Sequence, residues 1–233
     1  MKIILLYGLR RSGNHFLIST ILQQFQTWVH INDVGLSYDD YIIYKNTPKT
    51  LGRIDREYTG FKGVDCVLIS MEDKQIEYEE LAKFSTEEDV HSIMLLRNPY
   101  NNAASLWQMT RKCPEYTSNC ISLWKIYASQ YLSDTPIHLK VLYDKFATDE
   151  NYVTECLSRL GIQNTTIDNT ITHPFQRSSF KDETLSKKCY GGLADCNFKN
   201  DPAFLELFDN ETIQDIDKLW NQVLIIQNPQ PSS

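Results

Sequence analysis

The strongest constraint on the fold comes from the N-terminal segment. It contains an apolar run, a short loop with two glycines and a helical repeat, in that order. Ile3–Tyr7 is uninterrupted apolar sequence, as expected of a strand buried on both faces of a parallel sheet. Gly8–Asn14 then holds two glycines separated by four residues. Apolar residues next recur at helical spacing, at Phe16, Leu17, Ile21, Leu22 and Phe25. The segment therefore predicts a strand, a glycine loop and a helix.

Three further apolar runs predict strands, and helical patterns lie between and after them. The expected strands are Val64–Ser70, Ser92–Leu96 and His138–Tyr143. The expected helices are Asn101–Met109, Asn119–Leu132, Asp149–Leu160 and Glu211–Ile226. Alternating strands and helices predict a three-layer α/β/α fold with a mainly parallel central sheet. The two-glycine loop after its first strand makes the expected fold P-loop-like. We expect one domain over residues 1–227 and a frayed tail over residues 228–233.

Parallel sheets bind ligands at the carboxyl ends of their strands. This rule places four segments, far apart in the sequence, at one edge of the expected sheet. They are Gly8–His15, Ser70–Asp73, Arg97–Asn98 and Tyr143. We expect the functional site at this edge.

An uneven distribution of acidic residues indicates an anion site. The chain has 30 Asp and Glu against 23 Lys and Arg. Three windows nevertheless lack any acidic residue: Met1–Asn32, Val90–Pro114 and Asn169–Lys181. These windows contain Arg10, Arg11, Arg97, Arg111, Arg177 and Lys181. In an otherwise acidic protein, we expect these segments to fold around an anion. The alternative is chance combined with apolar core sequence, which excludes acids anyway.

The composition excludes several classes of protein. A net charge of −7 argues against a general nucleic-acid binder. No apolar run approaches the roughly 20 residues that span a bilayer, and Ile3–Leu6 is too short for the core of a signal peptide. Six cysteines are too few for a disulfide scaffold, so we expect reduced thiols and a cytoplasmic location. Whether Cys113 pairs with Cys120, or Cys189 with Cys196, stays open.

The glycine loop has the spacing of a Walker A loop but lacks two of its functional residues. A nucleotide-triphosphate loop continues with Lys, which reaches the phosphates, and with Ser or Thr, which holds Mg²⁺. Asn14 and His15 occupy these positions here, and the cationic charge comes earlier, from Arg10 and Arg11. The loop therefore predicts an anion site that does not depend on Mg²⁺. A purely structural turn is the alternative.

A second motif lies at the end of the third expected strand. Arg97 ends this strand, and Ser105 follows eight residues later on the next helix. An arginine and a hydroxyl in this arrangement can hold a phosphate through charged hydrogen bonds. In the alternative interpretation, Arg97 forms a structural salt bridge.

These motifs resemble those of the sulfotransferases that use 3'-phosphoadenosine 5'-phosphosulfate (PAPS). Leu9–Leu17 is similar to the family's PKSGTTWL-like loop, with Arg11 in place of its lysine and Phe16 in place of its aromatic residue. Arg97 and Ser105 match the arginine and serine that bind the 3'-phosphate in the family. Tyr143–Lys145 looks like the YED-like segment near the adenine. The segments GLRRSGNH, LISMED, LLRNPYNNAAS and SSF are similar to a bacterial and viral branch.

The resemblance implies PAPS as donor, adenosine 3',5'-bisphosphate (PAP) as product and no metal. The acceptor is a hydroxyl or amine of an unidentified small molecule or carbohydrate, and residues 33–63 are expected to shape its pocket. Arg177, followed by Ser178–Phe180 and Lys181, is the nearest match to a late RKG-like segment that closes the donor site in many members. The implied donor-binding residues are Arg10, Arg11, Ser12, Gly13, Asn14, His15, Phe16, Arg97, Ser105, Tyr143, Ser178, Ser179 and Phe180.

The transfer needs a stabilised leaving phosphate and a general base. Arg11 and Ser12 are the candidates at the leaving phosphate. Glu72 is the first candidate for the base, because several carbohydrate-type members of the family use a glutamate. Asp73, His15 and Asp33 are the further candidates, in that order.

Three alternatives to this interpretation remain open at the level of the sequence. Glu72 and Asp73 could cap a helix that begins near Lys74. The whole chain could be a small-molecule or nucleotide kinase with a divergent loop. It could also be a non-catalytic nucleotide-binding protein.

Overall fold

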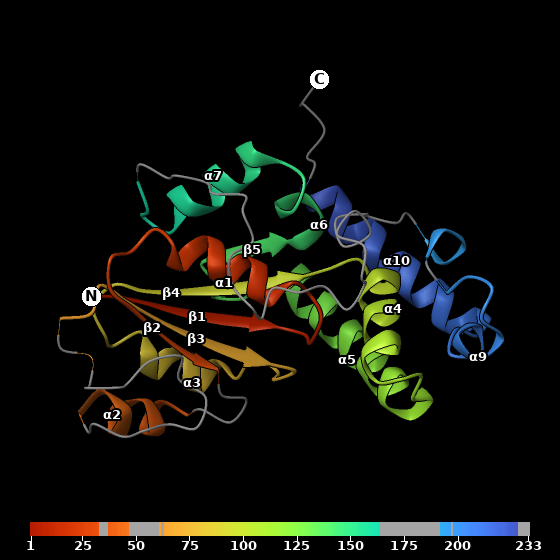
Figure 1. Cartoon of the computed structure of the whole chain (residues 1–233), viewed down its shortest axis with the longest axis horizontal. Helices are drawn as coiled ribbons and strands as arrows, with labels where there is room; N and C mark the ends of the chain where they lie inside the picture. Colours follow the sequence, from red (N-terminus) through yellow and green to blue (C-terminus); the bar gives the residue numbers. More distant parts are fainter. Residues whose placement is uncertain (33–36, 47–60, 62, 164–191, 197, 228–233) are drawn as a thin grey trace.

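The computed structural model describes residues 1–32, 37–46, 61, 63–163, 192–196 and 198–227. In this part of the chain, five strands form one sheet in the order β2–β3–β1–β4–β5 (Figure 1). All four pairings are parallel. The strands are β1 (Lys2–Gly8), β2 (Trp28–Asn32), β3 (Cys66–Glu72), β4 (Val90–Leu96) and β5 (Leu139–Leu142).

Helices cover both faces of the sheet, so the described residues form the expected three layers (Figure 1). One layer consists of α1 (Asn14–Leu22), α6 (Tyr143–Phe146) and α7 (Glu150–Arg159). The other contains α2 (Tyr38–Asn46), α3 (Tyr78–Phe84) and α5 (Pro114–Leu132), with α10 (Asn210–Gln227) packed on α5. The helix α4 (Pro99–Met109) lies beyond the carboxyl ends of the strands, near the short helices η2 (Leu193–Asp195) and α9 (Pro202–Leu205).

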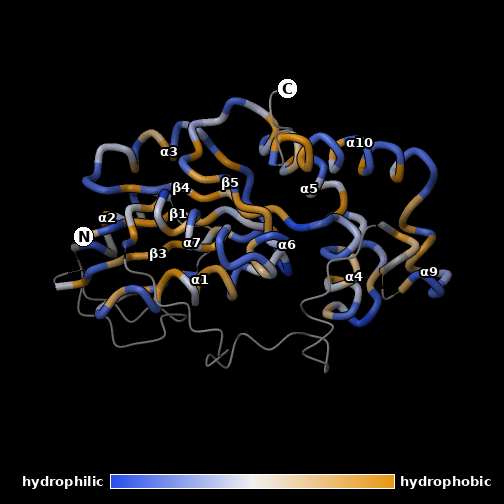
Figure 2. Tube along the Cα trace, turned by 90° about the horizontal axis from the view of Figure 1, so that it is seen from above, coloured by the Kyte–Doolittle hydropathy of each residue, from blue (hydrophilic) through white to orange (hydrophobic). Residues whose placement is uncertain are grey.

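The central strand β1 divides the hydrophobic core into two parts. Its alternate residues Ile3, Leu5 and Tyr7 pack with α5 and α10, whereas Ile4 and Leu6 pack with α1 and α7. Figure 2 shows the hydrophobic strands enclosed by helices with hydrophilic outer surfaces. Each fully buried aliphatic side chain contributes roughly 1.5–3 kcal/mol. The carboxyl end of β1 is therefore anchored on both faces, and this fixes the start of the glycine loop.

The four predicted strands are present, but the structure corrects their limits and adds a fifth. The strand β2 was not predicted, because Trp28–Asn32 is a short edge strand in which His30 and Asn32 interrupt the apolar run. The strand β3 runs two residues beyond the predicted end, since Ser70 and Glu72 stay paired with Leu6 and Gly8. The helix α1 ends at Leu22, before Phe25.

Three further details bear on function. Tyr143, predicted as the end of a strand, is the first residue of α6. Among the described helices, none combines the length and apolar character that a membrane span requires. Cys113 and Cys120 are not joined to each other, and both are thiols.

Candidate functional site

The glycine loop turns tightly between β1 and α1, and close contacts require both of its glycines. Gly13 has a left-handed backbone with φ of 95°, and a Cβ atom there would lie 2.0 Å from the Tyr143 ring. A Cβ atom on Gly8 would lie 2.1 Å from Oδ1 of Asn14. Arg11 is also left-handed, with φ of 65°. Alternating backbone conformations of this kind form concave sites that bind anions.

The helix α4 holds the middle of the loop in place. The Asn102 amide donates to the carbonyl oxygen of Arg10 at 2.9 Å and to Oγ of Ser12 at 3.2 Å. Ser12 is completely buried, and its N–H donates to the Leu9 carbonyl oxygen at 3.0 Å. These hydrogen bonds therefore fix the position of the loop relative to α4.

Arg97 lies at the end of β4 and is only 8% exposed. Its Nη1 atom donates to the carbonyl oxygen of Arg11 at 2.8 Å, and its guanidinium lies 4.8 Å from the centre of the Tyr143 ring. Its Nε atom is buried without a hydrogen-bond partner, and Arg97 forms no ion pair with any residue that the structure describes. The alternative of a structural salt bridge has no support in the described part of the chain.

Arg11 lies beside Arg97 and connects the two sequence motifs. Its Nε atom donates to Oγ of Ser105 at 3.1 Å. Burial and then the positive charge of Arg97 lower the pKa of Arg11. Two guanidinium groups therefore lie close together in a poorly solvated place, which favours a bound anion.

Arg10 turns away from this pair. Its Nε atom lies 3.2 Å from Asp73 Oδ2 and 3.8 Å from Glu72 Oε2, and its Nη1 donates to the Tyr116 hydroxyl at 2.7 Å. Burial lowers the pKa of Arg10, but Asp73, Tyr116 and Glu72 together outweigh burial and raise this pKa overall. The carboxylates of Asp73 and Glu72 therefore balance the positive charge of Arg10. Arg11, in contrast, lies beside a second positive charge, that of Arg97.

Glu72 and Asp73 lie at the same edge of the sheet as the loop, as predicted. Glu72 is the last residue of β3, directly beside Gly8. The interpretation in which they cap a helix near Lys74 is wrong, because α3 begins at Tyr78. Burial raises the pKa of Asp73, although its bonds to Arg10 oppose this.

The two carboxylates differ in how their oxygens are used. Asp73 accepts from the Arg10 N–H at 2.7 Å on one oxygen and pairs with the Arg10 side chain on the other. Glu72 accepts from the Asn14 amide at 3.0 Å on Oε1, and its Oε2 has only the longer approach to Arg10. Of the two, Glu72 has the oxygen that is less committed to protein contacts.

Aromatic residues adjoin the two arginines. Phe16 on α1 makes edge contacts with Tyr143 and Phe146, with ring centres 6.5 Å and 5.8 Å apart. The Asn98 N–H donates to Asp144 at 2.7 Å, which joins the end of β4 to α6. Tyr143 therefore lies beside Arg97, and Phe16 lies against Tyr143.

Other predicted residues are less informative. His15 is the second residue of α1 and is half-buried. Asp33, Arg177, Ser178, Ser179, Phe180 and Lys181 lie outside the described residues, as do residues 34–36, 47–60 and 62 of the expected acceptor region 33–63. The sequence analysis missed Asn102 and Tyr116. Asn102 could have been found from the Asn101–Asn102 pair, which lies in a helix turn without acidic residues. Nothing in the sequence pointed to Tyr116.

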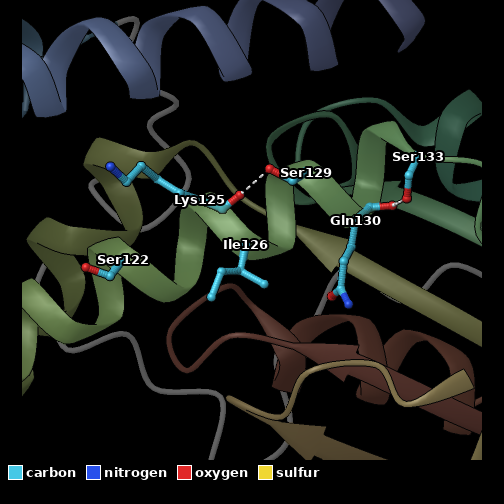
Figure 3. Close-up of a pocket in the computed structure, with 6 residues that line it drawn as sticks. All are labelled: Ser122, Lys125, Ile126, Ser129, Gln130 and Ser133. Atoms are coloured by element: carbon cyan, nitrogen blue, oxygen red, sulfur yellow. Dashed lines mark hydrogen bonds between the residues drawn. The ribbon is translucent and has the colours of Figure 1, made fainter.

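A shallow pocket lies on one face of α5, lined by Ser122, Lys125, Ile126, Ser129, Gln130 and Ser133 (Figure 3). The Ser129 and Ser133 hydroxyls donate to carbonyl oxygens of their own helix, from Lys125 and Gln130. These hydroxyls are therefore already occupied, and none of the candidate residues lines the pocket. Among the described residues, no group of three or more His, Cys, Asp or Glu side chains could hold a metal ion.

No protein-family model and no curated protein matches the chain. In structure it is similar to mouse sulfotransferase SULT7A1 in complex with PAP, with 15% identity and a TM-score of 0.48, over 96% of this chain and 84% of that one. A sulfotransferase from Alicyclobacillus acidocaldarius has 15% identity and a TM-score of 0.41, over 76% and 88% of the two chains. The sulfotransferase domain of the Synechococcus PCC 7002 olefin synthase has 11% identity and a TM-score of 0.46, over 99% and 96%. A functional assignment has to come from the residues of the chain itself.

Proposed function

We propose that this chain is a PAPS-dependent sulfotransferase. The observation that carries the proposal is the buried positive charge of Arg97, which has no carboxylate partner among the described residues. An unpaired buried charge costs several kcal/mol, so a protein keeps one where a ligand supplies the opposite charge. The unpartnered Nε of Arg97 and the Ser105 hydroxyl, which Arg11 contacts, are suited to a phosphate.

The donor fits this part of the chain in three respects. Arg97 and Ser105 would hold the 3'-phosphate, and the glycine loop with Arg11 would hold the 5'-phosphosulfate at the N-terminus of α1. Phe16 and Tyr143 offer aromatic surface to the adenine. No Mg²⁺-binding hydroxyl follows Gly13, so we infer that transfer does not need a metal.

In the reaction, the bond between sulfur and the bridging phosphate oxygen breaks, and its electron pair leaves with PAP. A new bond forms between sulfur and the acceptor oxygen or nitrogen. Arg11 is placed to stabilise the charge that develops on the leaving phosphate. The developing negative charge is stabilised most strongly at Arg11, because the positive charge of Arg97 lies beside it.

We assign the general base to Glu72, which takes the proton of the acceptor hydroxyl or amine. Both Asp73 oxygens are engaged by Arg10, whereas Oε2 of Glu72 has only a 3.8 Å approach to that side chain. Glu72 also lies beside Gly8, where the loop begins. The acceptor is a small molecule or carbohydrate with a hydroxyl or amine.

Two measurements test the proposal against a kinase and against a non-catalytic nucleotide-binding protein. PAP in the presence of a metal chelator should raise the melting temperature, and ATP with Mg²⁺ should raise it much less. Radiolabelled PAPS should lose its sulfuryl group to glucose, glucosamine, para-nitrophenol or water without added metal. Stabilisation by ATP with Mg²⁺ alone would support a kinase, and PAP binding without any loss of label would support a binding protein.

A further inference from the structure

The Asn14 side chain lies between the glycine loop and the Glu72 carboxylate. It is 3% exposed and is the first residue of α1. Its Nδ2 atom donates to the Leu9 carbonyl oxygen at 3.1 Å and to Glu72 Oε1 at 3.0 Å. Both amide hydrogens therefore have acceptors, one in the loop and one on the neighbouring strand.

The sheet register explains how Asn14 reaches Glu72. Gly8 and Glu72 are direct neighbours on β1 and β3. Oδ1 of Asn14 occupies the space where a side chain at Gly8 would begin, since a Cβ atom there would lie only 2.1 Å away. The absence of a side chain at Gly8 thus lets the Asn14 amide cross one strand and reach the next.

The hydrogen bonds also fix which way the amide points. Rotating it by half a turn would set Oδ1 against the Leu9 carbonyl and the Glu72 carboxylate, both of which are acceptors. In the observed orientation, Oδ1 is buried without a hydrogen-bond partner among the described residues. This orientation costs free energy, because Oδ1 is buried without a hydrogen bond, but it directs an N–H group of Asn14 at Glu72.

We propose that Asn14 is a positioning residue that holds Oε1 of Glu72, so that Oε2 is presented to the acceptor's proton. This inference rests on the proposed function, and it extends that function to a residue that touches the base rather than the reacting atoms. A hydrogen bond to Oε1 fixes the rotation of the carboxylate, and Arg10 near Oε2 limits its other movement. A base that is held in this way is already oriented for proton transfer.

A purely structural role for Asn14 is the competing explanation, because the bond to Leu9 also stabilises the loop. The two roles differ in whether the effect of changing Asn14 depends on Glu72. Residues that act as one unit show non-additive effects on turnover, whereas independent contributions multiply.

The test is a double-mutant cycle of Asn14→Ala and Glu72→Gln, measured as the loss of label from radiolabelled PAPS. The reactions contain glucose, glucosamine and para-nitrophenol, and transfer to water is counted as well. Asn14→Ala should lower turnover roughly 10- to 100-fold, as expected for a hydrogen bond to a charged group. Asn14 was among the expected donor-binding residues, but its side-chain amide donates to Leu9 and Glu72 and not to a ligand. PAP affinity should therefore change less than about threefold, since the variant leaves Arg97 and Arg11 intact.

In the Glu72→Gln background, Asn14→Ala should have almost no further effect on turnover. Thr20→Val is the matched control, because Thr20 is buried in the same helix and donates to the Phe16 carbonyl oxygen at 2.9 Å without touching Glu72. It should leave turnover nearly unchanged. If Asn14→Ala does not fold, Asn14→Asp keeps the size, removes both donors and should lower turnover at least as much.

Equal fold-losses from the Asn14 change in both backgrounds would overturn the positioning role and leave the proposed function intact. Parallel losses of turnover and PAP affinity would do the same. A wild-type protein that binds PAP but releases no label would overturn the proposed function, and the positioning role with it.

Discussion

Arg97 donates a hydrogen bond from Nη1 to the carbonyl oxygen of Arg11 at 2.8 Å, which ties the end of β4 to the glycine loop. Arg11 in turn contacts Ser105 on α4 at 3.1 Å. The two phosphate subsites that the sequence suggested are therefore connected through Arg11. The hydrogen bonds from Arg97 to Arg11 and from Arg11 to Ser105 therefore orient the side chains of both subsites together.

The first prediction concerns Arg97. Arg97→Ala removes the buried charge, and PAP affinity should fall roughly 10- to 100-fold, because hydrogen bonds to charged groups contribute about 1.5–3 kcal/mol. Titration calorimetry checks this. Arg159→Ala removes an exposed arginine on α7 and should leave the affinity unchanged. Equal affinities in the two variants would refute a role for Arg97 in phosphate binding.

The second prediction separates the two arginines of the loop. Arg11→Ala should lower turnover by about 10²–10³, as for other groups that stabilise a developing charge. Arg10→Ala should change PAP affinity much less than Arg11→Ala does, because Arg10 is engaged by Asp73, Glu72 and Tyr116. Steady-state kinetics and PAP titration measure both effects. A greater loss of PAP affinity in Arg10→Ala would mean that the loop binds its ligand one residue earlier.

The third prediction concerns the contact between Gly13 and Tyr143. Gly13→Ala should destabilise the protein more than Gly63→Ala, as measured by chemical denaturation. Both glycines are left-handed, with φ of 95° and 76°, but only Gly13 has a neighbour within reach of a Cβ atom. The strain in backbone conformation costs roughly 1–2 kcal/mol in each case, and overpacking adds about 1–3 kcal/mol at Gly13. Equal losses would mean that Tyr143 can move aside freely.

The fourth prediction is a pH effect of His138, the residue directly before β5. His138 Nδ1 accepts from the N–H of Ser92 at 3.1 Å. Burial, and then the nearby His91, lower the pKa of His138 from its ordinary value of 6.5. Below that value the unfolded chain binds a proton that the native protein resists, so the stability contributed by His138 is present above pH 6.5 and is lost on acidification.

His138→Asn keeps an acceptor oxygen but does not titrate. The variant should therefore lose less free energy of unfolding than the wild type between about pH 7.5 and about pH 5.5. Urea denaturation at the two pH values gives this difference. An identical pH dependence in both proteins would rule out His138 as a contributor.

The sequence predicted the parts of the site that depend on local pattern. The apolar run Ile3–Tyr7 predicted the strand, the two glycines predicted the loop, and the helical repeat from Phe16 predicted the helix. The rule for parallel sheets then brought Arg97 and Glu72 to the same edge, and the structure confirms this placement. These features follow from burial and periodicity, which neighbouring residues determine.

The rest of the site depends on contacts between distant segments. The direction of the Arg10 side chain depends on Tyr116, which lies 106 residues further along the chain. The link between Asn14 and Glu72 depends on the register of β1 and β3, and on the end of β3 two residues later than predicted. The edge strand β2 was missed because its polar His30 and Asn32 interrupt the apolar pattern.

The most direct test of the account compares the binding of PAP with that of adenosine 5'-monophosphate by calorimetry, with a metal chelator present. The two ligands differ only in the 3'-phosphate that we assign to Arg97 and Ser105. We expect PAP to bind roughly 10- to 100-fold more tightly in the wild type, and the two ligands to bind almost equally in Arg97→Ala. Equal binding of both ligands by the wild type, or binding of PAP only when metal is added, would contradict the account.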